Sequence, residues 1–128
     1  MTLLTELDGL TAADVIHPRL SSLPASATIA EVRDFFAASS SRRLAVFADG
    51  ERFVGSIEVD APSLSADPAD AASAHAAQGP TIAPDASAVA ARDLALAQPS
   101  RRVPVVDDGG RLLGVVAIDK HLQRFCGV

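Results

Sequence analysis

Two pairs of adjacent arginines are the residues of this chain with the clearest capacity to bind a ligand: Arg42 with Arg43, and Arg101 with Arg102. A guanidinium group is planar and always charged, and it can donate two parallel hydrogen bonds to a phosphate group. The alternative is that each pair is solvated surface charge, which contributes little to stability. The sequence leaves both roles open.

The two arginine pairs occupy the same place in an internal repeat. Residues 23–60 align without a gap to residues 82–119 at an offset of 59, and 13 of the 38 aligned pairs are identical. Two copies are too few for a solenoid, and 128 residues is close to the usual size of one domain. We therefore expect one pseudo-symmetric α+β domain whose halves cover each other's apolar faces.

Each copy carries the signals of a short strand, a helix, a strand, a turn and a second strand. Thr28, with Glu31 three residues later, forms the pattern of a capping box, and Ser87 is placed to open the matching helix. Gly50 and Gly109 lie in Asp-Gly turns between apolar runs, and such turns require a positive φ. The predicted helices cover 29–38 and 89–97, and the predicted strands cover 44–47, 53–57, 103–106 and 112–116.

Shorter helices are expected outside these elements. Thr11 is placed to cap a helix over 11–16, and a weak helix is expected around 69–77. An aspartate ends each copy, and Asp119 is expected to precede a closing helix over 120–125. At such a position aspartate is often simply a helix cap.

Composition argues against several classes of protein. The net charge is −5 and the basic residues are not massed on one segment, so we expect no nucleic-acid partner. No apolar run approaches the ~20 residues of a membrane span. Residues 1–10 carry acids and no basic residue, unlike a secretory signal. A single cysteine suits a reducing compartment, and we place the protein in the cytoplasm.

Other candidate constellations do not match known chemistry. The glycines from Gly109 to Gly114 lead into a strand rather than a helix, unlike a phosphate-binding loop. No serine lies in the pattern of a nucleophile elbow. The three histidines, His17, His75 and His121, do not have the spacing of metal ligands. We therefore expect neither a metal site nor an enzyme.

The run RRVPVVDDGGRLLGVVAID, from Arg101 to Asp119, resembles the CBS (cystathionine-β-synthase) domain, as does its weaker partner RRLAVFADGERFVGSIEVD from Arg42 to Asp60. The resemblance covers about 13–125 and is to a tandem pair, or Bateman module. It implies two β-α-β-β-α repeats packed through their sheets. Repeat one would cover about 11–61, the linker about 62–70 and repeat two about 71–126 within a single module of 1–128.

The resemblance also implies partners. Such modules commonly form homodimers, which alanine-rich helical faces would permit, and they regulate an attached or separate protein. Many bind adenine nucleotides or adenosyl compounds in clefts between the repeats. We therefore expect no required cofactor, with an adenosine-containing or other anionic metabolite as the candidate ligand. The alternative is an interaction or dimerisation module whose site no longer binds a nucleotide.

The chain departs from the nucleotide-binding pattern of that family. There, the glycine of the last strand is followed after three residues by Ser or Thr, which reaches phosphate, and after six by Asp, which accepts from ribose hydroxyls. Counting from Gly114 gives Ala117 and Lys120. Counting from Gly55 gives Glu58 and Ala61.

The candidate ligand-binding residues therefore combine the arginine pairs, the shifted aspartates, one lysine and the first residue of each copy. Glu58 would repel an anion in copy one, so an anion should prefer the copy that contains Arg102 and Lys120. The full candidate set is Arg102, Arg101, Lys120, Asp119, Ile82, Arg43, Arg42, Asp60 and Leu23.

Overall fold

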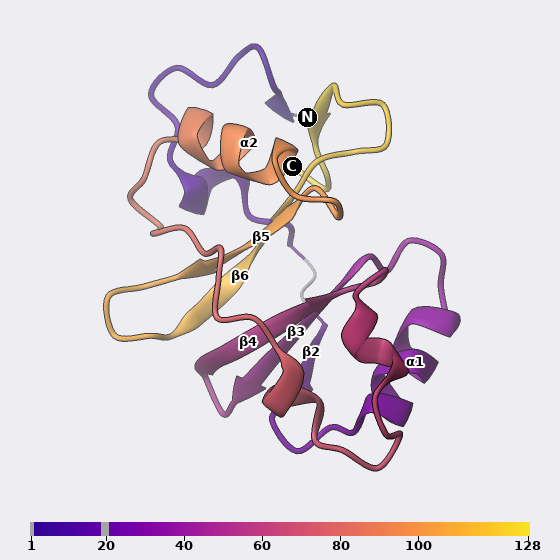
Figure 1. The fold of residues 1–128 in the computed structure, drawn as a ribbon. Helices are drawn as coiled ribbons and strands as arrows, with labels where there is room; N and C mark the ends of the chain where they lie inside the picture. The colour runs from indigo at the N-terminus through magenta and orange to yellow at the C-terminus, as the bar shows by residue number, and fades with distance from the viewer. Residues whose placement is uncertain (1, 19–20) are drawn as a thin grey trace. The chain divides into compact units, whose positions relative to one another are not determined.

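The computed structural model describes residues 2–18 and 21–128, which form two compact units (Figure 1). The copy-one unit consists of residues 21–79, and the copy-two unit consists of residues 1–20 together with 80–128. Each unit therefore combines one sequence repeat with a segment that lies outside that repeat. No helix in the described part of the chain is long and apolar enough to cross a membrane.

The copy-one unit is a three-stranded sheet with one α-helix. β2 (Ser22–Pro24) runs parallel to β3 (Leu44–Asp49), which pairs antiparallel with β4 (Arg52–Glu58). α1 (Ile29–Ala37) begins at the expected capping box, in which Thr28 and Glu31 each accept from the other's backbone N–H.

The core of the copy-one unit lies between α1 and the sheet. Apolar side chains of α1 and the strands form it, and two short 3₁₀ helices, η2 (Pro62–Ser65) and η3 (Ala72–His75), add to its edge. Burial of these side chains supplies most of the stabilisation of a small unit. The buried members are Ala27, Ile29, Val32, Ala45, Phe47, Ile57 and Ala72.

The copy-two unit repeats this topology around a hairpin of β5 (Arg102–Val106) and β6 (Leu112–Ala117). Ile82 takes the place of β2 through a parallel bridge to Val105. α2 (Ala88–Leu96) is capped by Ser87, as expected, and its small buried side chains allow close packing on β5. The core contacts include Ala88, Ala91, Ala95, Val103, Val105 and Val116.

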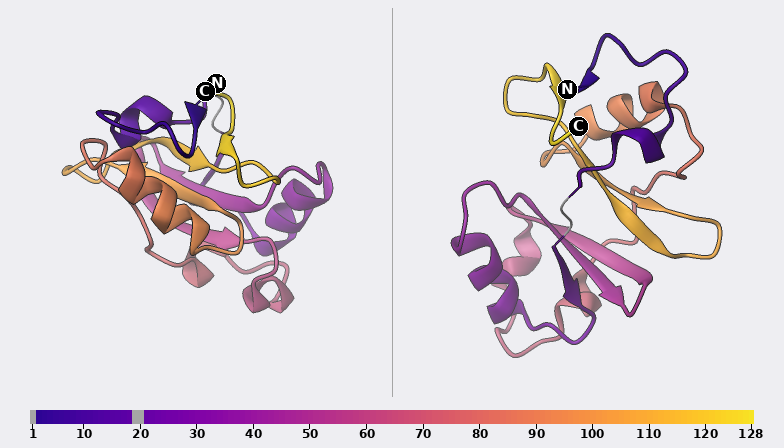
Figure 2. Two further views of the ribbon diagram at one scale, coloured as in Figure 1. Left: turned by 90° about the horizontal axis from the view of Figure 1, so that it is seen from above. Right: turned by 180° about the vertical axis from the view of Figure 1, so that it is seen from behind.

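The ends of the chain complete the copy-two unit. β1 (Thr2–Leu3) pairs antiparallel with β7 (Arg124–Phe125), and both views of Figure 2 show the two termini side by side. Phe125 is fully buried, and the N–H of Thr2 donates to the carbonyl of Val128 at 2.6 Å. η1 (Ala12–Val15) follows the expected cap at Thr11 as a single 3₁₀ turn.

One predicted helix is wrong. Residues 120–123 form a turn and residues 124–125 form β7, where a closing helix over 120–125 was expected. The carboxylate of Asp119 accepts from the N–H groups of Gln123 and Arg124, four and five residues later. A helix cap would accept from N–H groups two or three residues later, so the aspartate closes a turn instead.

The second hairpin also corrects a prediction. Gly50 has the expected positive φ of 60° in a two-residue loop between Asp49 and Arg52. In the second hairpin the loop covers residues 107–111, and Gly110 rather than Gly109 has the positive φ, 84°. The two loops therefore differ in length although the sequences align without a gap.

The two hairpins differ in register by one residue. In copy one Ala45 lies opposite Ile57, and at the offset of 59 this would place Pro104 opposite Val116. Instead Val103 lies opposite Val116. β5 is thus advanced by one residue relative to β3, while the helices and the following strands keep the offset of 59.

Gly114 is required by a close contact inside the copy-two unit, because a Cβ atom there would overlap Cγ2 of Ile16. We predict that Gly114→Ala lowers the free energy of unfolding by about 1–3 kcal/mol, since added volume forces neighbours out of place. Gly109→Ala is the matched control, because its Cβ would meet only an Asp107 oxygen at 3.4 Å. Chemical denaturation measures both, and equal effects would contradict the close packing.

Candidate functional site

One backbone hydrogen bond in each copy joins the start of a strand to the residue before the terminal aspartate. The N–H of Val59 donates to the carbonyl of Arg43 at 3.0 Å, next to Asp60. The N–H of Ile118 donates to the carbonyl of Arg101 at 3.0 Å, next to Asp119. Within each copy the backbone of a candidate arginine therefore lies beside the backbone that leads into the candidate aspartate.

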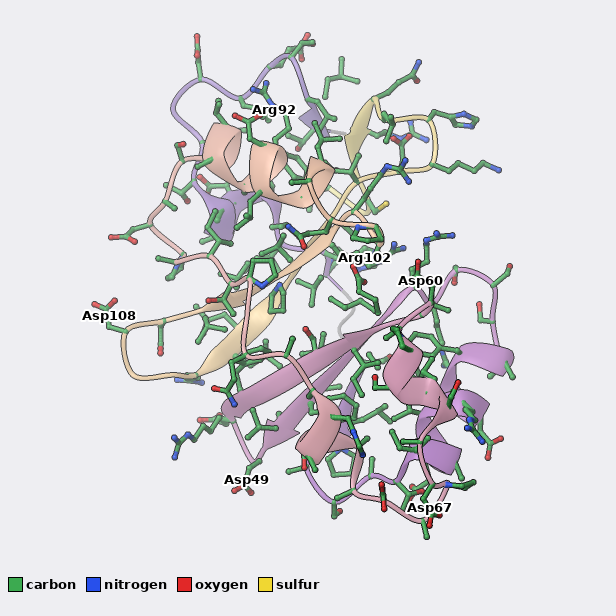
Figure 3. The ribbon with its side chains drawn as sticks, in the orientation of Figure 1. Asp49, Asp60, Asp67, Arg92, Arg102 and Asp108 are labelled. Carbon is green, nitrogen blue, oxygen red and sulfur yellow. The ribbon has the colours of Figure 1, made fainter. Side chains whose placement is uncertain are left out.

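In the copy-two unit this arrangement gathers positive charge at one end of the hairpin. Arg101 directly precedes β5, Arg102 is its first residue, and Lys120 follows Asp119 just beyond β6. Asp108 lies in the loop at the opposite end, as Figure 3 shows by the positions of its label and that of Arg102. The loop end carries Asp107, Asp108 and Arg111, so the larger group of basic residues lies at the start of β5.

The side chains of this end differ in how they are held. Arg102 is half-buried, and its Nη1 donates to the carbonyl of Ser100 at 2.7 Å. The half-buried Arg101 guanidinium and the exposed Lys120 amine have no acceptor among the residues that the structure describes. Both groups are available to an external anion.

Asp119 is held within its own turn. Its Oδ1 accepts from the N–H of Gln123 at 2.8 Å and from that of Arg124 at 3.3 Å, and its Oδ2 lies 3.6 Å from Nε of Arg124. The hydrogen bond from Gln123 is the main cause that holds the pKa of Asp119 below its ordinary value; partial burial opposes it, and Arg124 adds to it. The side chain is 13% exposed, so a ligand hydroxyl would have to reach a carboxylate already in use.

In the copy-one unit, one arginine of the pair has a structural role. Nη1 of Arg42 donates to the carbonyl of Phe35 at 3.0 Å, and the guanidinium lies 4.4 Å from the centroid of the Phe35 ring. This carbonyl belongs to the last turn of α1, where acceptors lack helical partners. Arg43 and Asp60 are exposed, with no side-chain partner among the described residues.

The first residue of each copy lies on the other edge of the strand. Leu23 pairs in parallel with Phe47, and the N–H of Ile82 donates to the carbonyl of Pro104 at 3.0 Å. Ile82 is buried in the core of its unit, and Leu23 packs against the core of the other. The structure therefore brings together Arg101, Arg102, Asp119 and Lys120, while Ile82 lies further along β5.

Three residues near this end had no role in the sequence interpretation. The backbone N–H groups of Gln123 and Arg124 donate to Asp119. A turn of this length has no recognisable sequence pattern apart from the aspartate, so these two residues could not be identified from the sequence. Cys126 donates its N–H to the carbonyl of Ala117, the residue opposite Arg102. Burial raises the pKa of its thiol above the ordinary value, so it stays protonated at neutral pH and is a poor nucleophile.

Within residues 2–18 and 21–128, no group of three His, Cys, Asp or Glu side chains is placed to hold a metal ion. His75 instead pairs with Asp70, whose Oδ2 lies 3.1 Å from its Nε2. The chemistry of the site is therefore that of fixed positive charge near hydrogen-bonding backbone.

Comparison with known proteins identifies the family. Residues 77–119 match the family described as CBS domain. The fold is similar to the cystathionine β-synthase pair domain of a putative Mg²⁺ transporter from Shewanella oneidensis, with a TM-score of 0.74, 16% identity, and coverage of 90% of this chain and 69% of that chain. Residues 77–119 thus match a CBS domain, and the chain as a whole has the fold of a CBS pair. The predicted α+β class and the predicted resemblance to CBS pairs are confirmed.

Other CBS structures of similar fold were determined with nucleotides. A CBS domain protein from Pyrobaculum aerophilum, complexed with AMP, has a TM-score of 0.66 and 25% identity, covering 84% of this chain and 87% of that chain. The cytosolic domain of the Mg²⁺ channel MgtE, in complex with ATP, has a TM-score of 0.68 and 23% identity, covering 93% of this chain and 50% of that chain. The comparison with curated proteins found no match.

The role of Arg42 in the copy-one unit can be tested directly. We predict that Arg42→Ala lowers the free energy of unfolding by about 1–2 kcal/mol, because it removes a hydrogen bond to the end of α1 and a cation–π contact. Arg43→Ala should change it by less than about 0.5 kcal/mol, as is usual for an exposed side chain without partners. Urea denaturation of both variants measures the difference, and equal losses would contradict the assignment.

The turn held by Asp119 should depend on pH. Because the folded-state pKa lies below that of the unfolded chain, the charged carboxylate stabilises the fold above the unfolded pKa, and this contribution is lost as the pH falls through the folded value. Asp119→Asn should therefore be less stable than the native chain at pH 7 and equally stable well below pH ~4. Asp60→Asn is the control and should match the native chain at both pH values, as judged by denaturation. If the free energy of unfolding of Asp119→Asn differed from that of the native chain by the same amount at both pH values, the stabilising role of the Asp119 charge would be contradicted.

Proposed function

We propose that this CBS module is a regulatory sensor of an anionic, adenosine-containing metabolite, whose phosphate binds at the start of β5. The observation that carries the proposal is the excess of positive charge there. Arg101, Arg102 and Lys120 flank the turn in which the Asp119 carboxylate accepts from the backbone N–H groups of Gln123 and Arg124. Charge of this kind attracts phosphate and can hold it by bidentate hydrogen bonds.

Similar structures support the class of ligand. Two of the compared CBS structures contain AMP or ATP. In this chain Ala117 stands where a hydroxyl would help to hold phosphate, so the arginines must supply more of the binding energy. The copy-one unit offers the exposed Arg43 alone, because Arg42 is bound to α1 and Glu58 ends β4 opposite Leu44.

Regulation would follow from differential affinity. A ligand that binds one arrangement of the module better than another shifts the population toward it, by no more than the difference in binding free energy. A partner protein that recognises the favoured arrangement would then read the ligand concentration. The partner and the homodimer remain predictions from the family resemblance, and the cytoplasmic location remains a prediction from the composition.

A second function has one observation in its favour. The Asp119 carboxylate accepts two backbone hydrogen bonds and faces Arg124, so it is poorly placed to accept from a ribose. A module that keeps the CBS fold for dimerisation or partner binding, and binds no nucleotide, would tolerate this arrangement. The two functions differ in whether any nucleotide stabilises the chain.

A thermal-shift screen separates them. The probes are AMP, ATP, S-adenosylmethionine, NAD and cyclic di-AMP. Under the sensing proposal at least one probe stabilises the module, by about 2.7 kcal/mol at 100 times its dissociation constant. If none of them shifts the melting temperature at millimolar concentration, the interaction module is the better account.

Calorimetric titration then locates the site for whichever probe binds. We predict that Arg102→Ala weakens binding by about ten- to a hundredfold, the effect of removing a charged hydrogen bond. Arg43→Ala should weaken it less. Arg52→Ala removes the same charge from an exposed position at the start of β4 and controls for general electrostatics. A larger loss for Arg43→Ala would contradict a site in the copy-two unit.

A further inference from the structure

The turn before the strand is one residue shorter in copy two. In copy one the N–H of Arg42 donates to the carbonyl of Ser39 at 3.2 Å, and the carbonyl of the next residue, Arg43, accepts from Val59. In copy two Arg101 makes both contacts: its N–H donates to Gln98 and its carbonyl accepts from Ile118, each at 3.0 Å. Arg101 therefore makes the two backbone contacts that Arg42 and Arg43 share in copy one.

Arg101 achieves this through a left-handed backbone. Its φ is 53°, and among the described residues other than glycine only Leu122 also has a positive φ. Arginine rarely adopts this conformation, since its Cβ crowds the neighbouring carbonyl. Such a conformation persists only where the surrounding contacts determine it, and it is enriched at functional sites.

The shortened turn changes which residues of β5 lie on each face of the sheet. Because β5 is advanced by one residue, Arg102 takes the strand position that Leu44 holds in copy one, and Arg101 takes that of Arg43. Side chains alternate along a strand, and Val103 and Val105 face the α2 core. Arg102 therefore lies on the opposite sheet face, where copy one carries a leucine.

We propose that Arg101 is the positioning residue of the anion site: its left-handed backbone sets β5 one residue forward and thereby places Arg102 at the strand position that Leu44 holds in copy one. Copy two then carries arginines at the two positions where copy one carries Arg43 and Leu44. The anion-binding part of this inference rests on the proposed function. The part that concerns the backbone of Arg101 and the register of β5 does not.

The backbone part is tested by a pair of substitutions with a matched control. Both Arg101→Gly and Arg101→Ala remove the guanidinium, but only glycine adopts a positive φ without cost. The folding equilibrium constant should be about fivefold or more larger for Arg101→Gly than for Arg101→Ala. At Arg43, whose φ is negative, the order should reverse, with alanine more stable than glycine. The same order at both positions would overturn the inference.

The binding part uses AMP as the probe in calorimetric titrations, with the nuclear Overhauser contact between Val103 and Val116 as a check of the register. Arg101→Gly should keep this contact and bind AMP more tightly than Arg101→Ala. Equal affinities of the two variants would show that Arg101 acts through its charge alone, and would overturn its positioning role. Failure of the native chain to bind any of the five probes of the thermal-shift screen would overturn the nucleotide proposal itself, whereas the order of stabilities would be unaffected.

Discussion

The backbone hydrogen bond from Ile118 to the carbonyl of Arg101 is the contact on which the candidate site depends. It closes the β5–β6 hairpin at the end away from the loop, and it fixes the arginine pair against the aspartate turn. Copy one contains the corresponding bond from Val59 to Arg43. A bond of this kind contributes only about 1 kcal/mol, but it sets the register and therefore the direction of every side chain on the strand.

The two copies use their arginines differently because their helices end differently. At the end of α1, Arg42 donates to the carbonyl of Phe35 and lies over its ring. At the end of α2, Nε2 of Gln98 donates to the equivalent carbonyl, that of Leu94, at 3.1 Å. Because Gln98 bonds to this carbonyl, Arg101 does not make the helix-end contact that Arg42 makes in copy one. The guanidinium of Arg101 is therefore available to a ligand in the copy that has the shorter turn.

The sequence predicts the helices and the hairpins but not their register. Capping residues and the helical period locate α1 and α2 to within a residue, because each signal is local. β5 gives no such signal, since Val103, Pro104, Val105 and Val106 are all apolar and either face could be buried. The slip at Arg101 is invisible in a gapless repeat, and Asp119 fits a helix cap or a wider turn equally well.

The most direct test of a site in copy two is a titration of ¹⁵N-labelled protein with AMP, followed by the backbone amide resonances of each residue. We expect the largest shifts at residues 101–103 and 118–120, with the hairpin loop at 107–111 unchanged. Shifts concentrated at residues 42–44 and 59–61 would place the ligand in copy one and contradict this account.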